Sequence, residues 1–439
     1  MGRGLYTLSA DFGTSSVKTA VIDEHRTILK ASRRSYQYRI LEENQVELSM
    51  ETVEAAFYET VRELKEFLPY VSLISFDTFA PSLVMMEKDG KPLYPIVTHL
   101  DRRSREDTKK IIDIFGKDKY RNITGTLPYA GGVTLTSLLW FFHYRPELTK
   151  KIYKIGHLST YLFKRLTGQR AMDEVNASIT GMYDTVHNSG WSQEICEKSG
   201  VPMSILPQVK EAGNTFELVL PEMAEKLGVG RNTMVNLGTQ DVASALAGAG
   251  ADKKGQILCI SGSSEMIAIL TDKPVTNDKY YLRNSGIKGL WQVFSITTGG
   301  FAIDWFREQF YTDMSKEEFY SSFLPDLLEK RFDAGGVTFH PYLTGDRQSL
   351  KRKRGSFGGL SLDTKRDHML CALVVGIQSQ AMQTLRLCGD IIPNKQKMTA
   401  TGNLAENEAY INIKSRLFGG AAIEVIDNCP LIGNVRRML

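Results

Sequence analysis

The sequence lacks the features that mark several large protein classes. Only five of its 439 residues are cysteines, they are scattered, and no Cys-x-x-Cys pair occurs. We therefore expect reduced, mostly buried thiols rather than a disulfide framework or a zinc site. No apolar run reaches the roughly 18 residues that a membrane helix requires, and the first predicted strand begins too early to leave room for a signal peptide. These absences predict a cytoplasmic protein that has no membrane partner.

A strong charge of one sign is also lacking. The chain has 54 basic and 50 acidic residues, which gives a net charge of +4. A nucleic-acid-binding protein would need basic residues gathered on one face, and the one basic run, Lys351-Arg352-Lys353-Arg354, is interpreted as a solvated loop. We therefore predict no nucleic-acid partner. With 42% hydrophobic residues, the chain is long and apolar enough to form two sizeable cores.

The first structural feature that the sequence predicts is a β-hairpin. Residues 5–11 and 17–23 read as strands joined by a glycine-hydroxyl turn, and residues 28–36 as a third strand. Because a strand follows the turn, this loop is neither a P-loop nor a dinucleotide fingerprint, both of which open a helix. A helix over 49–67, capped by Ser49, and strands over 71–76 and 82–87 follow. This alternation predicts a mixed α/β domain.

A second hairpin of the same type lies later in the chain. Strands over 256–260 and 266–270 flank another glycine-serine turn, and its Gly262 is 249 positions after Gly13. A duplicated architecture explains this, with two α/β lobes that each offer one hairpin tip to a shared cleft; coincidence is the alternative. We also expect helices over residues 243–251, 365–388 and 405–417, and polar connections over residues 184–200 and 213–230.

Both hairpin tips suit phosphate binding. Glycine lets backbone N–H groups approach phosphate oxygens, and hydroxyls add donors without bulk. Beside the first tip, Lys18 adds a cation, and Asp11 could hold a hydrated Mg²⁺ that offsets the phosphate charge. The second tip would hold the same phosphates from the other side. For either tip alone, a plain tight turn is an equally good explanation. The tips consist of Gly13, Thr14, Ser15 and Ser16, and of Gly262, Ser263 and Ser264.

Further polar residues are candidates for the chemistry. Asp241 ends an apolar strand just before a predicted helix, so it can cap that helix or act as a general base toward a substrate hydroxyl. Taken alone, the cap is the simpler interpretation. Asp101 and Arg103 share one face of an extended segment, so they can bind a polyhydroxylated ligand or pair with each other. His99 has no partner at metal-ligand spacing, so a zinc site is not expected.

In their order along nearly the whole chain, these motifs resemble the FGGY family of carbohydrate kinases, within the actin-like ATPase superfamily. The most specific part is residues 341–360, which is similar to the family's second signature. Three positions depart from the family pattern. His99 stands in place of a Trp, Ser137 in place of a Lys, and Val375 in place of an acidic residue.

The resemblance implies an α/β fold of two actin-like (ribonuclease H-like) lobes, residues 1–244 and 245–439, with a central cleft. It implies that ATP phosphorylates a hydroxyl of a five- or six-carbon ketose, polyol or sugar acid. Asp241 would be the base, and Asp11 would hold Mg²⁺ through water. The substrate-binding residues would be Phe79, Ala80, Asp101, Arg103 and Asp241. The nucleotide and its phosphates would be held by Asp11, Gly13, Thr14, Ser15, Ser16, Lys18, Gly262, Ser263, Ser264, Gly299, Gly300, Gly402 and Asn403.

The resemblance also narrows the acceptor. When the sequence is aligned with the glycerol kinase branch of the family, the substrate-binding Arg-Glu pair of that branch aligns with Phe79-Ala80. Glycerol is therefore expected to be a poor substrate. The Met-His pair of the xylulose kinase branch is absent from the same place. An apolar ring here can instead stack under the C–H face of a longer carbon chain.

Two other functions stay open at this level. The first is a non-catalytic actin-like pseudokinase that binds sugar or nucleotide. The departures from the family signatures favour it. The sequence also ends at Leu439, where family members usually continue through further helices, and without these helices the adenine site would lack part of its wall. The intact Asp11, Asp241 and hairpin tips argue against it. The second, a chaperone-type ATPase, lacks a candidate peptide-binding segment. A homodimer is one candidate for the oligomeric state.

Overall fold

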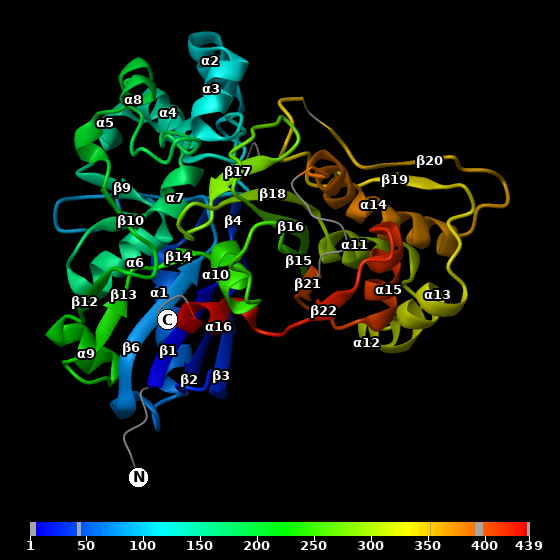
Figure 1. The fold of residues 1–439 in the computed structure, drawn as a ribbon, viewed down its shortest axis with the longest axis horizontal. Helices are drawn as coiled ribbons and strands as arrows, with labels where there is room; N and C mark the ends of the chain where they lie inside the picture. The colour runs from blue at the N-terminus through cyan, green and yellow to red at the C-terminus, as the bar shows by residue number, and fades with distance from the viewer. Residues whose placement is uncertain (1–5, 42–44, 352, 391–397, 437–439) are drawn as a thin grey trace.

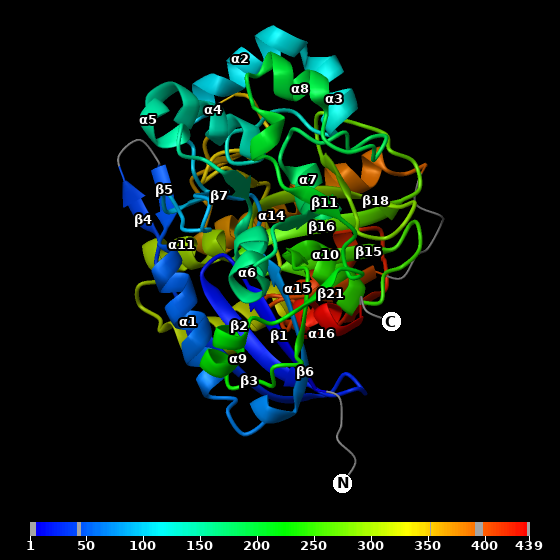
Figure 2. The same cartoon turned by 90° about the vertical axis from the view of Figure 1, so that its left-hand side faces the viewer.

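Two mixed β-sheets, one in each lobe, organise the chain. The computed structural model describes residues 6–41, 45–351, 353–390 and 398–436; Leu5 of the first predicted strand and Arg352 of the basic run lie outside these ranges. The first lobe occupies the left of Figure 1 and the second lobe the right, and Figure 2 shows the first lobe facing the viewer.

The N-terminal sheet is built on the predicted first hairpin. Its strand order is β12-β13-β6-β1-β2-β3, and β14 also pairs with β6. β1 and β2 are antiparallel, β2 and β3 are antiparallel, and β1 lies parallel to β6. The bounds are β1 (Tyr6–Phe12), β2 (Ser16–Ile22), β3 (Ile28–Ser35), β6 (Val71–Thr78), β12 (Phe216–Leu218), β13 (Met234–Asn236) and β14 (Thr239–Gln240).

The C-terminal sheet repeats this plan. Its order is β17-β18-β16-β15-β21-β22, in which β15, β16 and β18 form an antiparallel meander and β15 continues into the parallel pair β21 and β22. Strands β18-β16-β15-β21-β22 therefore correspond to β3-β2-β1-β6-β13, and the predicted two-lobed duplicated fold is confirmed. The bounds are β15 (Ile257–Ser261), β16 (Ser264–Thr271), β17 (Tyr281–Asn284), β18 (Trp291–Thr298), β21 (Met398–Thr401) and β22 (Ile423–Val425).

Helices cover both faces of the N-terminal sheet. On one face, Val17 and Val21 of β2 belong to the same core as α1 (Met50–Arg62), whose Ser49 side chain accepts a hydrogen bond from the Thr52 amide at 3.3 Å. On the other face, Ala20 and Ile22 pack against α16 (Cys429–Arg436). Because side chains alternate along a strand, one strand supplies two cores.

Helix α16 links the end of the chain to its beginning. It lies against β1 beside α10 (Asp241–Gly248), in red next to the blue strands of Figure 1. The two helices approach closely because Gly433 of α16 lies against the backbone of α10. A Cβ on Gly433 would lie 1.8 Å from the Ser244 carbonyl oxygen. α10 also packs its Val242 and Leu246 on the C-terminal sheet through Leu258 and Leu270. The α10–α16 pair thus crosses between the lobes.

Smaller elements complete the two lobes. The C-terminal lobe also has α11 (Gly300–Phe310), α12 (Lys316–Glu318), the π-helix η4 (Phe319–Phe323), α13 (Leu324–Lys330), β19 (Thr338–His340), β20 (Ser356–Gly358), α14 (Arg366–Leu387) and α15 (Glu408–Leu417). The N-terminal lobe also has β4 (Arg39–Leu41), β5 (Gln45–Leu48), η2 (Leu68–Tyr70), β7 (Ser82–Met86), β8 (Ile96–Thr98), α2 (Arg105–Phe115), α3 (Lys117–Thr124), α4 (Thr134–Tyr144), α5 (Pro146–Thr149), β9 (Lys154–Gly156), α6 (Leu158–Thr167), β10 (Ala171–Asp173), α7 (Glu174–Ile179), α8 (Gln193–Lys198), η3 (Met203–Ile205), β11 (Gln208–Lys210) and α9 (Pro221–Leu227).

Two predicted connections were wrong. Residues 184–200 contain α8, and residues 213–230 contain β12 and α9. Both helices are short, with six and seven residues, so their periodicity is too brief to stand out from the polar residues around them. Ile195 of α8 and Leu227 of α9 are nevertheless fully or almost fully buried.

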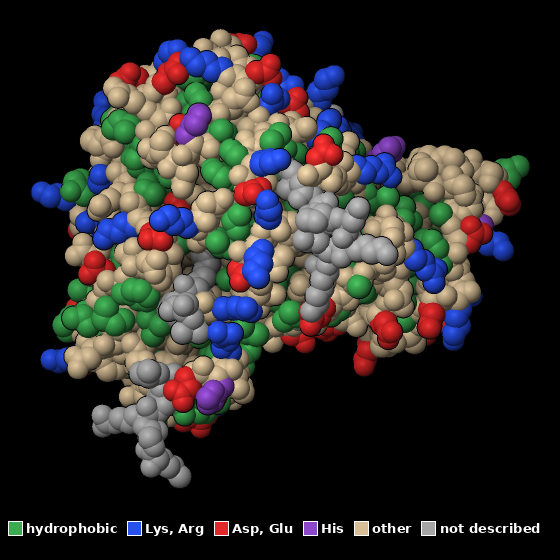
Figure 3. All heavy atoms as spheres, viewed as in Figure 1, with side chains coloured by type: hydrophobic (Ala, Val, Ile, Leu, Met, Phe, Trp, Pro, Cys, Tyr) green, Lys and Arg blue, Asp and Glu red, His purple; other side chains and the backbone are tan. Residues whose placement is uncertain are grey.

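The surface agrees with the charge analysis. On the face shown in Figure 3, basic and acidic side chains are interspersed rather than gathered by sign. Within the described ranges, no helix is both long and apolar enough to cross a membrane.

Candidate active site

Three aspartates from separate segments meet in the cleft. Asp11 near the end of β1 is the register partner of Asp77 on the parallel strand β6, and Asp241 begins α10 directly after β14, which also pairs with β6. The parallel pairing places the carboxyl ends of these strands at the same sheet edge. The Asp241 carboxylate accepts a hydrogen bond from the Val242 amide at 2.8 Å. Asp241 is the first residue of α10, and the N-cap position is occupied by Gln240.

Burial and mutual repulsion raise the pKa values of this cluster. Burial raises the pKa of Asp241 to about 7, and the charge of Asp11 adds to the shift. Burial, Asp11 and Asp241 together hold the pKa of Asp77 well above its usual value. The pKa of Asp11 is also raised by burial, although the Asp77 side chain, Lys18 and Arg33 act in the opposite direction. A carboxylate with a pKa near neutrality is suited to accept a proton at physiological pH.

The aspartate cluster fits a hydrated cation. Asp77 Oδ1 is buried without a hydrogen-bond partner, and its Oδ2 accepts a hydrogen bond from Asn434 Nδ2 at 2.7 Å. A divalent ion would relieve the repulsion among the carboxylates, and Mg²⁺ keeps several waters and needs only one or two protein carboxylates. Across the described parts of the chain, no group of three or more His, Cys, Asp or Glu side chains is placed to hold a metal directly.

The first hairpin tip is held in place by tyrosines. The Gly13 amide donates to the Ser16 carbonyl at 3.0 Å and closes the turn. The hydroxyls of Tyr36 and Tyr38 donate to the backbone carbonyls of Gly13 and Thr14. These contacts fix the backbone of the tip on its carbonyl side. The ammonium of Lys18 donates to Asn428 of the C-terminal lobe, so this lysine joins the lobes rather than projecting freely toward the tip.

The second hairpin tip is the meeting point of three segments. The Gly300 amide donates to the Gly262 carbonyl at 2.8 Å, and the Gly299 amide donates to the Ser263 carbonyl at 3.1 Å. Gly402 has a φ of +100°, and a Cβ there would lie 2.7 Å from the Ser261 carbonyl oxygen. A Cβ on Gly262 would meet nothing within 4 Å. The tip is therefore packed tightly behind and open in front, which suits close approach by a ligand.

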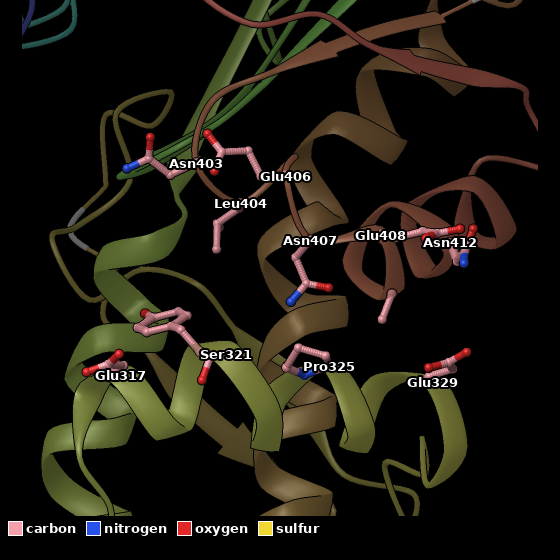
Figure 4. A pocket seen from close by; sticks show the side chains of 12 residues that line it. Glu317, Ser321, Pro325, Glu329, Asn403, Leu404, Glu406, Asn407, Glu408 and Asn412 are labelled. Carbon is pink, nitrogen blue, oxygen red and sulfur yellow. The ribbon is translucent and has the colours of Figure 1, made fainter.

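A cavity of about 690 Å³ opens between this region and the helices α12 to α13. This volume is within the range of small-molecule sites. Figure 4 shows Asn403 and Leu404 on one side and Glu317, Ser321 and Pro325 on the other. The lining also includes Glu329, Glu406, Asn407, Glu408 and Asn412. The predicted nucleotide residue Asn403 thus lies at a cavity, next to the Gly402 backbone that supports the second tip.

A second, much smaller cavity of about 40 Å³ lies beside Asp241 of the aspartate cluster. We call it the acceptor cavity; its lining includes the predicted residues Thr14, Phe79, Ala80 and Asp241. The rings of Phe79 and His99 meet edge to face with centroids 5.7 Å apart. The remaining lining residues are Pro81, His99, Gly131, Gly132, Gln240, Val242, Met266, Tyr281, Arg283, Phe294, Ile296 and Arg347.

Asp101 and Arg103 do not line the acceptor cavity. Their side chains are buried, and Arg103 Nε donates to Asp101 Oδ1 at 3.0 Å while its Nη2 donates to Glu47 at 2.7 Å. Asp101 also accepts from the Val46 amide at 2.7 Å. Of the two alternatives for this pair, the structure therefore shows the internal ion pair. The pair braces the segment that carries His99 to the acceptor cavity.

Sequence reasoning missed several residues of the site. Asp77 directly follows one predicted strand and Asp11 ends another, and this shared position at a strand end was a usable signal. Asn434 had no such signal, because its contact with Asp77 spans 357 positions and depends on where α16 docks. Arg283 and Arg347 likewise reach the acceptor cavity from distant segments of the C-terminal lobe.

Two α/β lobes of the same topology, with acidic strand ends in one and a glycine-rich tip in the other, define an actin-like fold with a cavity lined by both lobes. The family comparison agrees with this class. The model for the N-terminal domain of the FGGY family of carbohydrate kinases matches residues 6–248, more than half of the chain. The chain therefore belongs to the FGGY family of carbohydrate kinases.

Relatives along the chain support the same family. A gluconokinase of Bacillus subtilis is 27% identical over 427 residues, which cover 94% of this chain and 83% of the relative. A xylulose kinase of Staphylococcus xylosus is 24% identical over 420 residues, 94% of this chain and 86% of the relative. The predicted enzyme class, an ATP-dependent carbohydrate kinase, is confirmed, and the catalytic alternative is favoured over the pseudokinase.

Solved structures confirm the fold. The gluconate kinase from Lactobacillus acidophilus superposes with a TM-score of 0.87 at 19% identity, covering 99% of this chain and 89% of the other. The glycerol kinase of Plasmodium falciparum with ADP gives a TM-score of 0.85 at 22% identity, covering 99% of this chain and 88% of the other. At these identities the likeness concerns the two-lobed architecture.

Proposed function

We propose that this carbohydrate kinase transfers the terminal phosphoryl group of ATP to a hydroxyl of a five- or six-carbon ketose, polyol or sugar acid, with Asp241 as the general base. The observation that carries this proposal is that Asp241 lines the acceptor cavity with a pKa raised to about 7. As part of the proposal, residues 1–244 and 245–439 form the two lobes, and α16 reaches back onto the first. A cytoplasmic location stays a prediction.

Asp241 would accept the proton of the attacking hydroxyl. As the acceptor oxygen attacks phosphorus, its O–H bond breaks and the proton passes to the Asp241 carboxylate. Phosphoryl transfer depends mainly on position and on charge compensation rather than on covalent help from the protein. The Val242 amide fixes the orientation of the carboxylate through its 2.8 Å hydrogen bond, which supports in-line placement of the acceptor.

The nucleotide would extend from the 690 Å³ cavity to the hairpin tips. Four glutamates line that cavity, so it suits the uncharged adenosine part better than the triphosphate. The open front of the tip at Gly262 is placed for the phosphates. Thr14, Ser15 and Ser16 would provide hydrogen-bond donors from the first hairpin tip, as the family resemblance implies.

Mg²⁺ would be held through water by Asp11, with Asp77 and Asp241 nearby. When bound, the ion would neutralise phosphate charge and reduce the repulsion that, together with burial, raises the pKa values of Asp77 and Asp241. Asn434 would orient Asp77 through its 2.7 Å hydrogen bond.

The acceptor would lie against Phe79 and Ala80. Neither side chain can hydrogen-bond a hydroxyl, and both line the acceptor cavity. Glycerol, whose recognition depends on polar contacts along its whole short chain, is therefore expected to be a poor substrate. The gluconokinase and xylulose kinase relatives support acceptors of five or six carbons.

The test is the variant Asp241→Asn, measured by ADP release over a panel of sugars, polyols and sugar acids. Asn has the same shape but cannot accept the proton, so we expect turnover to fall by ~10²–10⁴ while nucleotide affinity changes only a few-fold. Asp184→Asn, a change of the same chemistry on a loop outside the cleft residues, is the control. Turnover of Asp241→Asn within tenfold of the parent would remove Asp241 from this role.

A further inference from the structure

The acceptor cavity contains two arginines that the phosphoryl transfer itself does not require. Arg283 lies on β17 and Arg347 on the segment that follows β19, and both line the cavity together with Asp241 and Phe79. The side chain of Arg283 is almost fully buried. Its guanidinium carbon lies 4.7 Å from the ring centre of Tyr281 and 4.5 Å from that of Phe294, so aromatic faces hold it in position.

Neither arginine has an acidic partner in the part of the chain that the structure describes. Among the described residues, no carboxylate forms an ion pair or a hydrogen bond with Arg283 or Arg347, although Asp241 acts on Arg283 through space. Arg103 offers the contrast, because it is paired with both Asp101 and Glu47. A buried cation without a partner is costly. A structural role alone would favour a paired guanidinium such as that of Arg103.

Positive charge accumulates around these side chains. Burial lowers the pKa of Arg283 to about 10, and it also lowers the pKa of Arg347. Arg102 lies nearby, where burial and the charge of Arg347 lower its pKa to about 9. Burial, followed by the charges of Arg347, Arg102 and Arg283, holds the pKa of His99 well below its usual value. The protein therefore gathers more positive charge here than its own carboxylates balance.

His99 provides an independent sign of a missing ligand. It is 9% exposed and lines the acceptor cavity, and its Nδ1 is buried without a hydrogen-bond partner. Buried polar atoms in proteins are rarely left without a partner. A polar group of a bound acceptor would provide one.

We propose that Arg283 and Arg347 form a subsite for a carboxylate of the acceptor, so that sugar acids are preferred over neutral ketoses and polyols of the same length. The inference rests on the proposed kinase function and narrows its substrate class. A guanidinium binds a carboxylate through two parallel hydrogen bonds. With the carboxylate at this subsite, a hydroxyl elsewhere on the same carbon chain would face Asp241.

A phosphate of the nucleotide is the other possible anion. The acceptor is favoured because both arginines lie in the cavity with Phe79 and Ala80, whereas Thr14 is the one residue proposed for the phosphates among its lining residues. The KM for ATP distinguishes the two sources.

The test compares matched pairs of acceptors. Gluconate and sorbitol differ at one end, where a carboxylate replaces a CH₂OH group, and xylonate and xylitol form the five-carbon pair. For the parent we expect a higher kcat/KM with at least one acid than with its neutral partner. Arg347→Gln should lower kcat/KM for that acid by ~10–100-fold, the usual range for a hydrogen bond to a charged group. The neutral acceptor and the KM for ATP should change less than about threefold.

Controls separate this inference from folding and from the proposed function. Arg354→Gln removes an exposed arginine from the same segment. It should leave the ratio of kcat/KM for the acid to kcat/KM for its neutral partner unchanged in both pairs. If Arg347→Gln does not fold, Arg283→Gln is measured in its place. Because Arg283 also lowers the pKa of Asp241, Arg283→Gln should in addition shift the pH profile upward.

Three outcomes would overturn the inference. They are a parent that prefers the neutral partner in both pairs, an equal loss for acid and neutral acceptors, and a raised KM for ATP as the main effect. If no acceptor is turned over, the proposed function has failed, and calorimetric binding of the same four compounds to the parent and to Arg347→Gln still decides whether the subsite holds a carboxylate.

Discussion

The two lobes share one sheet topology but use charge in opposite ways. At the cleft end of the N-terminal sheet, Asp11 and Asp77 lie side by side. Burial raises both pKa values, and the charge of Asp11 raises that of Asp77 further. At the corresponding end of the C-terminal sheet, Ser261 and Gly402 are uncharged. The buried carboxylate of that lobe, Glu265, is fully compensated by Lys414. The cleft end of the N-terminal sheet therefore carries uncompensated negative charge, whereas the corresponding end of the C-terminal sheet does not.

The compensated carboxylate supports the second hairpin tip. Glu265 accepts hydrogen bonds from the Lys414 ammonium, from the Tyr410 hydroxyl at 2.7 Å and from the Ser261 hydroxyl at 3.3 Å. These contacts tie the tip to α15. The comparison shows that two lobes with the same strand order can differ in function through a few polar residues.

The largest effect is expected from breaking the Glu265–Lys414 pair. Both side chains are 0% exposed, so Lys414→Met leaves a buried carboxylate without compensation and should lower the free energy of unfolding by ~3–5 kcal/mol. Chemical denaturation measures this change. The double variant Lys414→Met/Glu265→Gln removes the charge as well and should recover much of the loss. An unchanged stability of Lys414→Met would show that the pair does not stabilise this lobe.

The next effect separates packing from binding at the second tip. Gly402→Ala forces a side chain into a φ of +100° and against the Ser261 carbonyl, so we expect a loss of ~1–3 kcal/mol and a lower melting temperature. Gly262→Ala places its Cβ in open space, so it should leave the melting temperature unchanged but raise the KM for ATP. Equal melting temperatures for the two variants would contradict this division.

The aspartate cluster predicts a pH-dependent rate. The base must be ionised, and the pKa of Asp241 is raised to about 7. Below that pH, kcat/KM for the acceptor should fall about tenfold per unit, and above it the rate should level off. Direct measurement of ADP between pH 5.5 and 8.5 avoids the pH dependence of coupling enzymes. A flat profile over this range would rule out a base with this pKa.

The smallest expected effect is a gain in stability. The pKa of Asp241 rises from its ordinary 3.8 to about 7 in the folded protein, so ionisation opposes folding; the penalty is absent below pH 3.8 and is complete above pH 7. Asp241→Asn removes it and should raise the melting temperature by a few degrees at pH 8 and by less at pH 5. Asp184→Asn is the control. A lower melting temperature at pH 8 would show that the Val242 contact outweighs the repulsion.

The sequence by itself determined the parts that depend on local pattern. Alternating strands and the glycine turns predicted both hairpins, and β1, β2, β15 and β16 lie where they were expected. Glycine-hydroxyl turns singled out Asp11 and the segment around Gly262, and the family resemblance added the roles of Asp241 and Gly402; these roles stay predictions. The short helix α8 and the helix α9 were missed, since six or seven residues carry too little periodicity.

Only the tertiary structure decided which of these residues share a cavity. The position of Asn434 at Asp77 depends on the docking of α16 across the lobes. Arg283 and Arg347 line the same cavity as His99, although they come from distant segments. Asp101 and Arg103 looked like ligand-binding residues because a polar pair on one face serves either purpose; burial against Glu47 made them an ion pair. Burial and long-range charge, which set the pKa of Asp241, are properties of packing, and no local spacing encodes them.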